Sequence, residues 1–424
     1  MSDPRPADAP DAPATALERE RAERSQKRPT LRLKPKAGRR FFEGAPWIYA
    51  DEPVLDRRTR GVAAGAIARL EGADRAALGT VAVNLDSKIV ARLLDRDPDA
   101  EIDAGWFAAR LGAALDLRER LFSEPFYRLV HAEADGLPGL VIDRFGDALA
   151  VQPNAAWLET RRTALLAALD RVLNPRTIVW SGASRARALE GLPEEVRVLK
   201  GTLDGPIDAP MNGAIYRADL AAGQKTGLFY DHRPTHAFVA RLSAGRRVLD
   251  VFSHVGGFGL AALAAGARSA LAIDGSAAAL ALAAEGAERT GVAERFEARK
   301  GDAFDALRAL QQAGERFDVV VCDPPAFAPH RSAREAGLRA YAKTARLGLA
   351  VTAPGGVFTL CSCSHAVSAE ELAGLAADAV LRARRSARLL RSGGAGPDHP
   401  VHPHLPETAY LKTLTYQLGP EPLS

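Results

Sequence analysis

The sequence predicts a multidomain α/β protein whose C-terminal half is a doubly wound, parallel sheet. From about Leu242 onward, strand-like and helix-like segments alternate at the spacing typical of such a sheet. Between Leu31 and about Leu94, short β-prone segments are punctuated by Gly and Asp, which indicates a small β-rich domain. A length of 424 residues, at about 150 residues per domain, suggests two or three domains.

The composition is that of a globular protein. Apolar residues make up 47% of the chain and charged residues 25%, which excludes disordered, collagenous and coiled-coil chains. The net charge of +4 favours a nucleic-acid partner only if the basic residues cluster. Three cysteines crowded into the last quarter make a poor disulfide framework, and Pro354 to Gly356 interrupts the longest uncharged stretch. We therefore expect a cytoplasmic protein that contacts no membrane and keeps its thiols reduced.

The first 103 residues divide into a tail and a β-rich domain. Residues 1–29 lack an apolar period, so we expect them to be disordered, and residues 30–103 form the predicted domain. A run of eight basic residues without an acid extends from Arg24 to Arg40, and four aromatic residues follow it. The run is either a solvated charged surface or, with its aromatic neighbours, a site for RNA phosphates. The candidate RNA-binding residues are Arg32, Lys34, Lys36, Arg39 and Arg40.

Residues 104–222 predict a mixed middle domain. Apolar residues at helical spacing predict a helix over 104–121. Residues 127–153 predict a strand, a tight DGLPG turn and a hairpin, and a helix over 158–173 and a strand over 177–180 follow. Residues 223–424 form the third predicted domain.

The first parallel strand of that domain leads into the Gly-rich turn SHVGGFG. Such a turn lets a ligand approach the backbone at a helix N-terminus. The spacing lacks the G-x-G-x-x-G of dinucleotide sites, so an NAD-dependent oxidoreductase is disfavoured. Asp250 closes the strand, and Gly256 and Gly257 follow six and seven residues later. An acid at that point disfavours a phosphate and suits a cationic ligand such as S-adenosylmethionine, although a plain tight turn is the alternative.

Three further acids close strands or open the turns that follow them. Asp274 is placed to accept hydrogen bonds from two ribose hydroxyls, and Asp302, with Phe304, to hold an adenine. Asp323 begins Asp-Pro-Pro at the carboxyl end of a central strand, where α/β sheets bind ligands. Together with Asp250, they predict an S-adenosylmethionine-dependent methyltransferase domain.

The next strand ends in Cys361-Ser362-Cys363-Ser364-His365, beside the strand of Asp323. A buried cysteine is often only a small apolar residue. Two thiols at a strand end beside the cofactor crevice instead suggest a nucleophile. A thiolate that adds to carbon 6 of a pyrimidine activates carbon 5 for methylation, and Asp323 would then orient the base. The base must first be unstacked.

Two other charged segments have alternative readings. GQKTGLFYDHR, residues 223–233, is either a capped helix start or a lip over the cofactor crevice, in which Lys225 and Arg233 would contact the cofactor. His232 and His365 are possible proton acceptors. LRARRSAR, near Arg382 to Arg388, is expected to be a solvated helix end, with contact to RNA as the alternative.

These residues resemble the RlmI-like class of bacterial 23S ribosomal RNA (cytosine-5) methyltransferases from about Leu31 to Leu418. The motifs that carry the resemblance are GRRFFEGAPWIYA, EADGLPGLVIDRFGD, GQKTGLFYDHR, DVFSHVGGF, DPPAFA, CSCSH, and DHPV followed by ETAYLKTL. The resemblance implies an N-terminal PUA domain, a middle domain and a Rossmann-like class I methyltransferase domain with a seven-stranded sheet. Departures occur at His254, Val255 and Ala326, where relatives often have Tyr, Thr and Lys.

The resemblance also implies roles for single residues. It makes Cys363, the second thiol of the pair, the nucleophile. It assigns S-adenosylmethionine contacts to Phe252, Ser253, Gly256, Gly257, Asp274, Asp302 and Asp323. The implied product is 5-methylcytosine in 23S ribosomal RNA, either free or in a pre-ribosomal particle. No metal is expected, and a homodimer is one open oligomeric state.

Two other functions fit part of the sequence. Asp-Pro-Pro near an aromatic residue also serves methylation of an exocyclic base nitrogen, but that chemistry leaves the paired thiols without a role. A non-catalytic ribosome-assembly factor with a vestigial fold would not need the complete set of acids and glycines.

Overall fold

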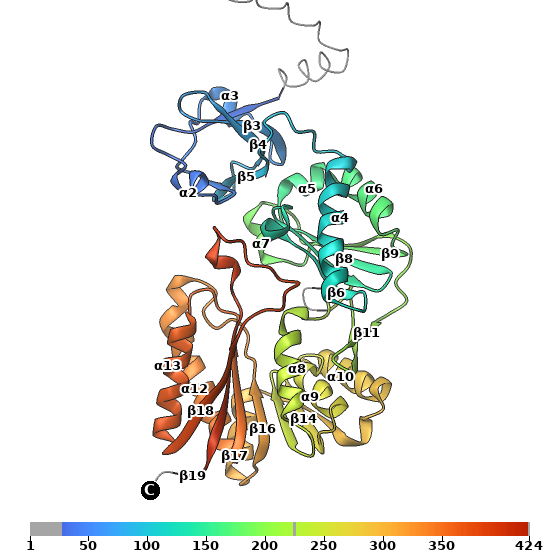
Figure 1. Cartoon of the computed structure of the whole chain (residues 1–424), viewed down its shortest axis with the longest axis vertical. Helices are drawn as coiled ribbons and strands as arrows, with labels where there is room; N and C mark the ends of the chain where they lie inside the picture. Colours follow the sequence, from blue (N-terminus) through green and yellow to red (C-terminus); the bar gives the residue numbers. More distant parts are fainter. Residues whose placement is uncertain (1–27, 224–225, 423–424) are drawn as a thin grey trace, which may run out of the picture.

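The computed structural model describes residues 28–223 and 226–422 (Figure 1). The predicted tail therefore lies outside the described residues except for Arg28 and Pro29. Within those ranges, no helix is both long and apolar enough to cross a membrane.

The N-terminal domain is built on a five-stranded sheet with the order β1-β3-β4-β5-β2. Its strands are β1 (Thr30–Arg32), β2 (Trp47–Tyr49), β3 (Ala66–Glu71), β4 (Ala77–Val83) and β5 (Ile89–Asp95). Two short helices accompany them, α2 (Arg39–Phe42) and α3 (Arg57–Arg60). Alternate apolar residues such as Leu31, Leu70 and Val81 are buried in its core, as the β-rich prediction requires.

The middle domain packs helices against a second five-stranded sheet, ordered β10-β9-β8-β7-β6. The predicted helix over 104–121 is confirmed as α4, whose first turn is capped by Asp103 through a hydrogen bond from the Trp106 amide. The helix predicted over 158–173 is two helices that meet at Arg161. The elements are α4 (Ala104–Leu121), β6 (Phe126–His131), η1 (Ala132–Asp135), β7 (Leu140–Phe145), β8 (Ala148–Pro153), α5 (Ala156–Thr160), α6 (Arg162–Val172), β9 (Thr177–Ser181), α7 (Arg185–Leu189) and β10 (Val196–Lys200).

The C-terminal domain follows a short hairpin and contains a seven-stranded sheet, ordered β15-β14-β13-β16-β17-β19-β18. This sheet confirms the predicted fold class. The elements are β11 (Ile207–Met211), β12 (Ala214–Ala218), η2 (Tyr230–His232), α8 (Arg233–Arg241), β13 (Arg247–Val251), α9 (Gly257–Ala264), β14 (Ser269–Asp274), α10 (Ala277–Thr290), η3 (Ala293–Arg295), β15 (Phe296–Lys300), α11 (Ala303–Gln312), β16 (Phe317–Cys322), η4 (Arg331–Ala333), α12 (Arg334–Val351), β17 (Thr352–Ser362), α13 (Ala369–Arg382), β18 (Arg385–Gly393), η5 (Pro406–Thr408) and β19 (Lys412–Pro422).

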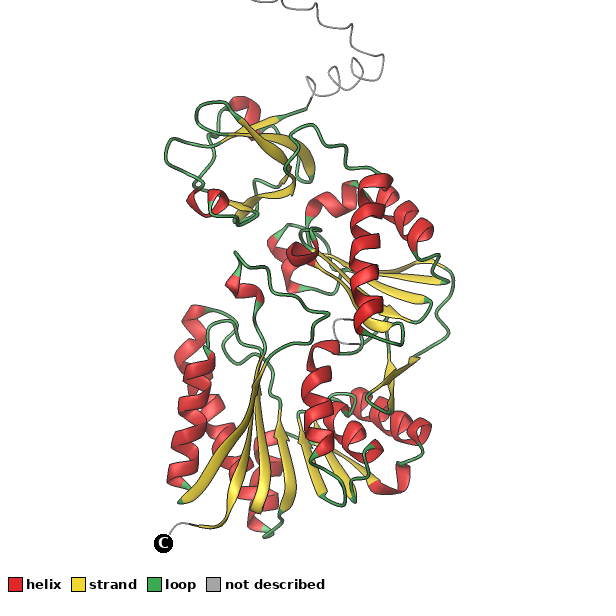
Figure 2. Cartoon of the chain, in the orientation of Figure 1, coloured by secondary structure: helices red, strands yellow, loops and turns green. Residues whose placement is uncertain are grey.

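Helices cover both faces of this sheet (Figure 2). Successive residues of β13 point to opposite faces, so Val248 joins the core under α9, whereas Leu249 joins the core under α11, α12 and α13. Strands β15, β14, β13, β16 and β17 are parallel, and β19 and β18 complete the sheet in antiparallel pairings. The strand order reverses between β13 and β16, and a ligand crevice is expected at the carboxyl ends of those two strands.

One predicted element is wrong. LRARRSAR was expected to be a solvated helix end, but α13 ends at Arg382 and β18 begins at Arg385. The Arg385 guanidinium donates hydrogen bonds to the carbonyl oxygens of Leu349, Thr352 and Ala353, at 2.8 to 3.3 Å. Pairing with β19, which is distant in the sequence, decides the conformation here over local charge.

Candidate functional site

The Gly-rich turn between β13 and α9 forms one wall of the crevice, but Asp250 does not line it. The Asp250 side chain is fully buried, and its Oδ2 accepts hydrogen bonds from the backbone amides of Phe258 and Gly259, at 3.1 and 2.9 Å. It therefore satisfies the first turn of α9 instead of facing a cationic ligand, which corrects the reading from sequence. Burial raises the pKa of Asp250 to about 7, against the lowering effect of those amides.

The turn itself is conformationally demanding. Phe252 and His254 have φ values of +64° and +50°, which non-glycine residues adopt rarely, and Gly256 has φ +80° as it begins α9. A Cβ atom on Gly257 would come within 2.8 Å of His236 Nε2. The Ser253 hydroxyl is buried and has no hydrogen-bond partner among the described residues. A tight turn with an unsatisfied buried hydroxyl suits a ligand that lies against the backbone.

Two of the predicted acids lie at the ends of the neighbouring strands. Asp274, at the end of β14, is half-buried and accepts hydrogen bonds from the backbone amides of His254 and Ser276, at 2.9 and 2.8 Å. Its carboxylate therefore joins the Gly-rich turn to the second strand. Asp302 is exposed and caps α11 through the amides of Phe304 and Asp305. The Phe304 ring lies near Phe252 and Phe327, with centroids 6.3 and 6.2 Å away.

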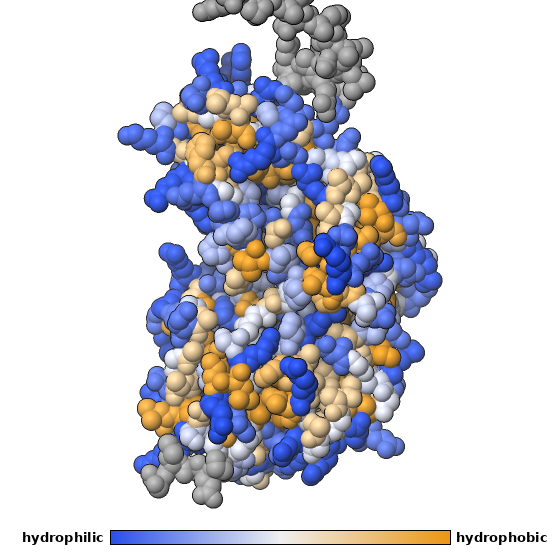
Figure 3. All heavy atoms as spheres, in the orientation of Figure 1, coloured by the Kyte–Doolittle hydropathy of each residue, from blue (hydrophilic) through white to orange (hydrophobic). Residues whose placement is uncertain are grey.

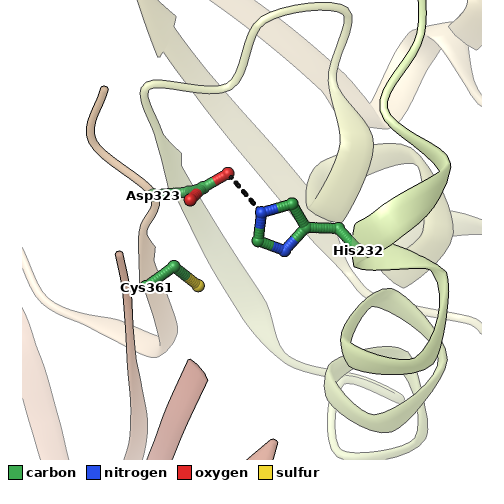
Figure 4. A group of neighbouring side chains, drawn as sticks. All are labelled: His232, Asp323 and Cys361. Atoms are coloured by element: carbon green, nitrogen blue, oxygen red, sulfur yellow. Dashed lines mark ion pairs between the residues drawn. The ribbon is translucent and has the colours of Figure 1, made fainter. Parts of the chain in front are cut away.

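Asp323 and the two thiols of CSCSH come from neighbouring parallel strands. In the register of β16 and β17, Cys322 lies opposite Leu360, so Asp323 is level with Cys361. Both point to the face of the sheet that α8 covers, where Asp323 Oδ2 lies 3.1 Å from His232 Nε2 (Figure 4). Cys361 is fully buried, and burial raises its pKa well above the usual value. Cys363, two residues further along, is half-exposed.

The turn that carries Cys363 is anchored on both sides. Ser364 Oγ accepts a hydrogen bond from the Ala328 amide at 2.9 Å and shares another with the Tyr341 hydroxyl at 2.8 Å. Lys412, at the start of β19, donates from Nζ to the carbonyl oxygens of Ser364 and Tyr410. Burial lowers the pKa of Lys412, and the nearby Cys363 acts in the opposite direction. The turn is therefore fixed to the Asp-Pro-Pro loop, to α12 and to β19.

The GQKTGLFYDHR segment contains two predicted cofactor contacts, Lys225 and Arg233, and the structure describes only Arg233. Lys225 lies outside the described residues. The Arg233 guanidinium donates to the Phe126 carbonyl oxygen and lies over the rings of Phe122 and Tyr230, at 4.4 and 5.4 Å. These contacts tie α8 to the middle domain, and among the described residues the buried Arg233 Nε atom has no hydrogen-bond partner.

The five basic residues of the N-terminal domain are on its surface, and most have local partners. Arg32 pairs with Glu71 at 3.1 Å, Arg39 with Glu43 at 2.9 Å and Arg40 with Glu407 at 3.0 Å. Lys34 and Lys36 are exposed, and Lys34 donates to the Asp51 carbonyl oxygen. On the face shown in Figure 3, the surface is hollowed between the N-terminal and C-terminal domains, and hydrophilic side chains border the hollow.

The sequence reasoning missed three residues that shape the site. Tyr341 and Lys412 hold the Cys363 turn, and buried Asp398 accepts a hydrogen bond from the Arg128 amide at 3.1 Å. Asp398 and Lys412 lie in the motifs DHPV and ETAYLKTL, so their presence was visible but their contacts were not. Tyr341 had no local signal, because an aromatic residue within a helix is usually a core residue.

The crevice fits S-adenosylmethionine. The buried Ser253 hydroxyl, the close backbone turn at Gly256 and Gly257, and the Asp274 carboxylate at the second strand end match a polar nucleoside with ribose hydroxyls. Phe252 and Phe304 offer apolar faces for a base. The residues that would hold the cofactor thus lie on β13 and β14 and in the loops that follow β13, β14 and β15.

Comparison with known proteins gives the family. Residues 192–414 match the family described as S-adenosylmethionine-dependent methyltransferase, and residues 31–96 match a PUA-like domain. Ribosomal RNA large subunit methyltransferase I of Erwinia tasmaniensis is 33% identical over 378 residues, which cover 85% of this chain and 96% of that protein. The protein of the same name from Aeromonas hydrophila is 34% identical over 376 residues, which cover 87% and 94%.

Solved structures agree on the fold. A methyltransferase crystallised with SAH superposes with a TM-score of 0.77 at 19% identity, over 92% of this chain and 100% of the other. A structure described as a SAM-dependent methyltransferase from Streptococcus mutans gives 0.76 at 19% identity, over the same shares. The cofactor is S-adenosylmethionine, and the chain belongs to the S-adenosylmethionine-dependent methyltransferase family, with a PUA-like domain ahead of its catalytic domain.

Proposed function

We propose that this enzyme methylates carbon 5 of a cytosine in 23S ribosomal RNA, with Cys363 as a covalent nucleophile. The observation that carries the proposal is that Asp323 directly follows β16 and Cys363 directly follows β17, the strand paired with it. The similarity to proteins named ribosomal RNA large subunit methyltransferase I, over most of both chains, supports the class of RNA.

The chemistry requires a nucleophile because carbon 5 of cytosine attacks a methyl donor poorly. The Cys363 thiolate adds to carbon 6, which makes carbon 5 electron-rich, and later elimination of the thiolate restores the ring. Bound S-adenosylmethionine supplies an electrophilic methyl group. Asp323 hydrogen-bonds the base edge and stabilises the charge that develops there. Lys412, whose ammonium group lies near Cys363, favours the thiolate.

The substrate has to reach this site as an unstacked nucleotide. The exposed cations of the N-terminal domain, Lys34 and Lys36 above all, supply contacts to RNA phosphates. The surface is hollowed between that domain and the catalytic domain (Figure 3), and we propose that RNA lies in this hollow. The N-terminal domain would thus bind RNA, and the C-terminal domain would carry out methyl transfer.

The test uses purified protein, labelled S-adenosylmethionine and ribosomal RNA from a strain that lacks this gene, followed by digestion to nucleosides. We expect label in 5-methylcytidine with the wild type. Cys363→Ala should bind S-adenosylhomocysteine as the wild type does but form no product. Cys361→Ala is the matched control and should still form product.

Three outcomes would change the proposal. Label in an N-methylated nucleoside would keep the enzyme class but remove the thiol mechanism. Full activity of Cys363→Ala would do the same. Absence of both label and cofactor binding would favour a non-catalytic assembly factor.

A further inference from the structure

His232 is held against Asp323 by its surroundings. It ends η2, immediately before α8, and its Nε2 atom lies 3.1 Å from Asp323 Oδ2 (Figure 4). The ring stacks on His236, with centroids 5.8 Å apart, and meets the Phe258 ring edge-to-face at 5.5 Å. Its side chain is 8% exposed and that of Asp323 is 24% exposed. The imidazole is therefore fixed, while the carboxylate remains open to the crevice.

The Asp323 carboxylate lies within hydrogen-bond distance of His232, and several other titratable groups are close to this pair. Cys361 Sγ lies within 4.8 Å of both groups, and its raised pKa keeps the thiol neutral. Burial and the neighbouring His232 lower the pKa of His236 well below its usual value, so His236 stays uncharged. The Asp231 carboxylate accepts a hydrogen bond from the Tyr410 hydroxyl, and the Arg233 guanidinium faces the middle domain. Asp250 is buried under α9.

A methyltransferase that uses a thiol on cytosine needs a proton at the base as well as a nucleophile. Addition to carbon 6 moves electrons onto N3, and that atom must be neutralised for the adduct to persist. An ionised carboxylate accepts hydrogen bonds but has no proton to give. An imidazolium in hydrogen-bond contact with the carboxylate supplies one.

We propose that His232 is a positioning residue that shares a proton with Asp323, so that Asp323 can donate it to N3 of the target cytosine. This inference rests on the proposed function. It concerns the acid that assists thiolate addition and does not alter the assignment of Cys363.

The proton balance of the step is as follows. The Cys363 sulfur forms a bond to carbon 6, the C5=C6 electron pair becomes C4=C5, and the C4=N3 pair moves onto N3. N3 takes the proton that Asp323 Oδ2 shares with His232 Nε2, which leaves a neutral imidazole beside a carboxylate. The C4=C5 pair then forms the bond to the methyl group, whose bond to the donor sulfur breaks, and the N3 lone pair restores C4=N3. Loss of the carbon-5 proton to solvent leaves the electrons that form C5=C6 and expel the thiolate, and the N3 proton returns to the pair. The pair ends the cycle as it began.

The experiment measures the single-turnover rate of methyl transfer to ribosomal RNA across pH 5.5 to 9. The wild type should show a rate that rises as Cys363 ionises and falls as the His232–Asp323 pair loses its proton. His232→Gln can still donate a hydrogen bond to Asp323 but carries no titrating proton. It should lose the falling limb and at least about tenfold in rate at neutral pH, at the low end of what general acids contribute. Binding of S-adenosylhomocysteine should stay within about twofold, because His232 is not assigned a cofactor contact.

His330→Gln is the matched control, because His330 is exposed on the loop that follows the same strand. It should keep both limbs. A wild-type profile without a falling limb would overturn the inference whether or not the variant folds. So would a His232→Gln profile equal to that of the wild type. Loss of wild-type activity with a chelator, restored by Zn²⁺, would also overturn it by showing that His232, Asp323 and Cys361 hold a metal. A wild type that makes no 5-methylcytidine would instead contradict the proposed function.

Discussion

The Asp250 carboxyl group accepts hydrogen bonds from the first turn of α9, next to the Gly-rich turn. The stability of the folded protein therefore depends on whether this group is protonated. The carboxyl group is fully buried and accepts two backbone hydrogen bonds. The pKa of Asp250 is raised to about 7 in the folded protein, whereas the pKa of an aspartate in the unfolded chain is about 3.9. Between these two pKa values, Asp250 keeps in the folded protein a proton that it loses in the unfolded chain. Between those two values the folded state binds more protons, so its stability falls as the pH rises.

Asp250→Asn should remove that dependence. The amide is neutral at every pH and still offers an oxygen to the Phe258 and Gly259 amides. We expect the wild type to lose free energy of unfolding relative to the variant from about pH 4 to about pH 7, by at most about 1.4 kcal/mol per pH unit. Urea denaturation at a series of pH values measures this difference. A constant difference between the two proteins would contradict the buried ionisation.

Lys412, on the neighbouring strand β19, lies near the proposed nucleophile Cys363. Lys412→Met removes the charge near Cys363 and the hydrogen bonds to the Ser364 and Tyr410 carbonyl oxygens. We expect about a tenfold lower rate at neutral pH and a rising limb that shifts to higher pH, because a cation stabilises the thiolate. Lys200→Met, in the middle domain, is the control and should leave the pH profile unchanged. An unshifted rising limb would limit Lys412 to a structural role.

At the scale of elements, the segment between β18 and β19 connects the catalytic domain to both other domains. Arg118 of α4 makes a bidentate ion pair with Asp135, with both contacts 2.7 Å, and donates to the Asp398 carbonyl oxygen at 3.0 Å. The Arg118 side chain is fully buried. On the other side of the segment, Glu407 pairs with Arg40 of α2.

Arg118→Met should be strongly destabilising, because it leaves the Asp135 charge buried without its partner. We expect a loss of about 3 to 5 kcal/mol, as is typical when one member of a buried pair is removed. Arg120→Met, on the same helix, breaks an exposed pair with Asp116 and should cost less than about 1 kcal/mol. Thermal denaturation of both variants gives the comparison. Equal losses would show that the buried pair contributes no more than a surface pair.

The sequence predicted elements well where the local pattern and the final packing agree. Alternation of strands and helices predicted the parallel part of the catalytic sheet, and α4 has the predicted bounds. The prediction failed at β18, where a run of charged residues resembled a helix end. There, pairing with β19 makes the segment a strand. A strand at a sheet edge can keep most of its side chains in solvent, so it need not show an apolar pattern.

The sequence predicted those candidate site residues that lie at the carboxyl ends of parallel strands. Asp274, Asp323 and the pair of thiols were predicted because parallel strands bring their carboxyl ends together, whereas the choice of Cys363 over Cys361 came from the resemblance alone. The direction of a side chain was not predictable, and so Asp250 was assigned to the crevice although it is buried under α9. The contact between His232 and Asp323 joins residues far apart in the chain, and no local motif encodes it.

At the scale of the whole molecule, the N-terminal domain is held by polar contacts to the middle domain. Trp47 Nε1 donates to Glu133 Oε1 at 2.9 Å, and Arg92 pairs with Glu190 at 2.9 Å in a nearly buried contact. The Asn84 amide also donates to the Glu190 side chain. These contacts fix the N-terminal domain, with its basic surface, against the middle domain.

Reversal of charge on that surface should weaken RNA binding and leave the crevice intact. Lys34→Glu combined with Lys36→Glu should lower affinity for ribosomal RNA, and the slope of log affinity against log salt should become smaller by about 1.5 if both lysines contact phosphates. Binding of S-adenosylhomocysteine, measured by calorimetry, should not change. An unaltered salt slope would place the RNA contacts elsewhere.

The position of β19 between β17 and β18 has a consequence for how the protein is made. During synthesis, β17 and the Cys363 turn emerge before the strand that pairs with Cys361 and Ser362. Until residues 412–422 follow, the nascent chain carries an apolar strand with an open edge, and the Cys363 turn lacks the Lys412 contacts. The Cys363 turn is therefore completed late in translation, and we expect chains that stall before β19 to be prone to aggregation.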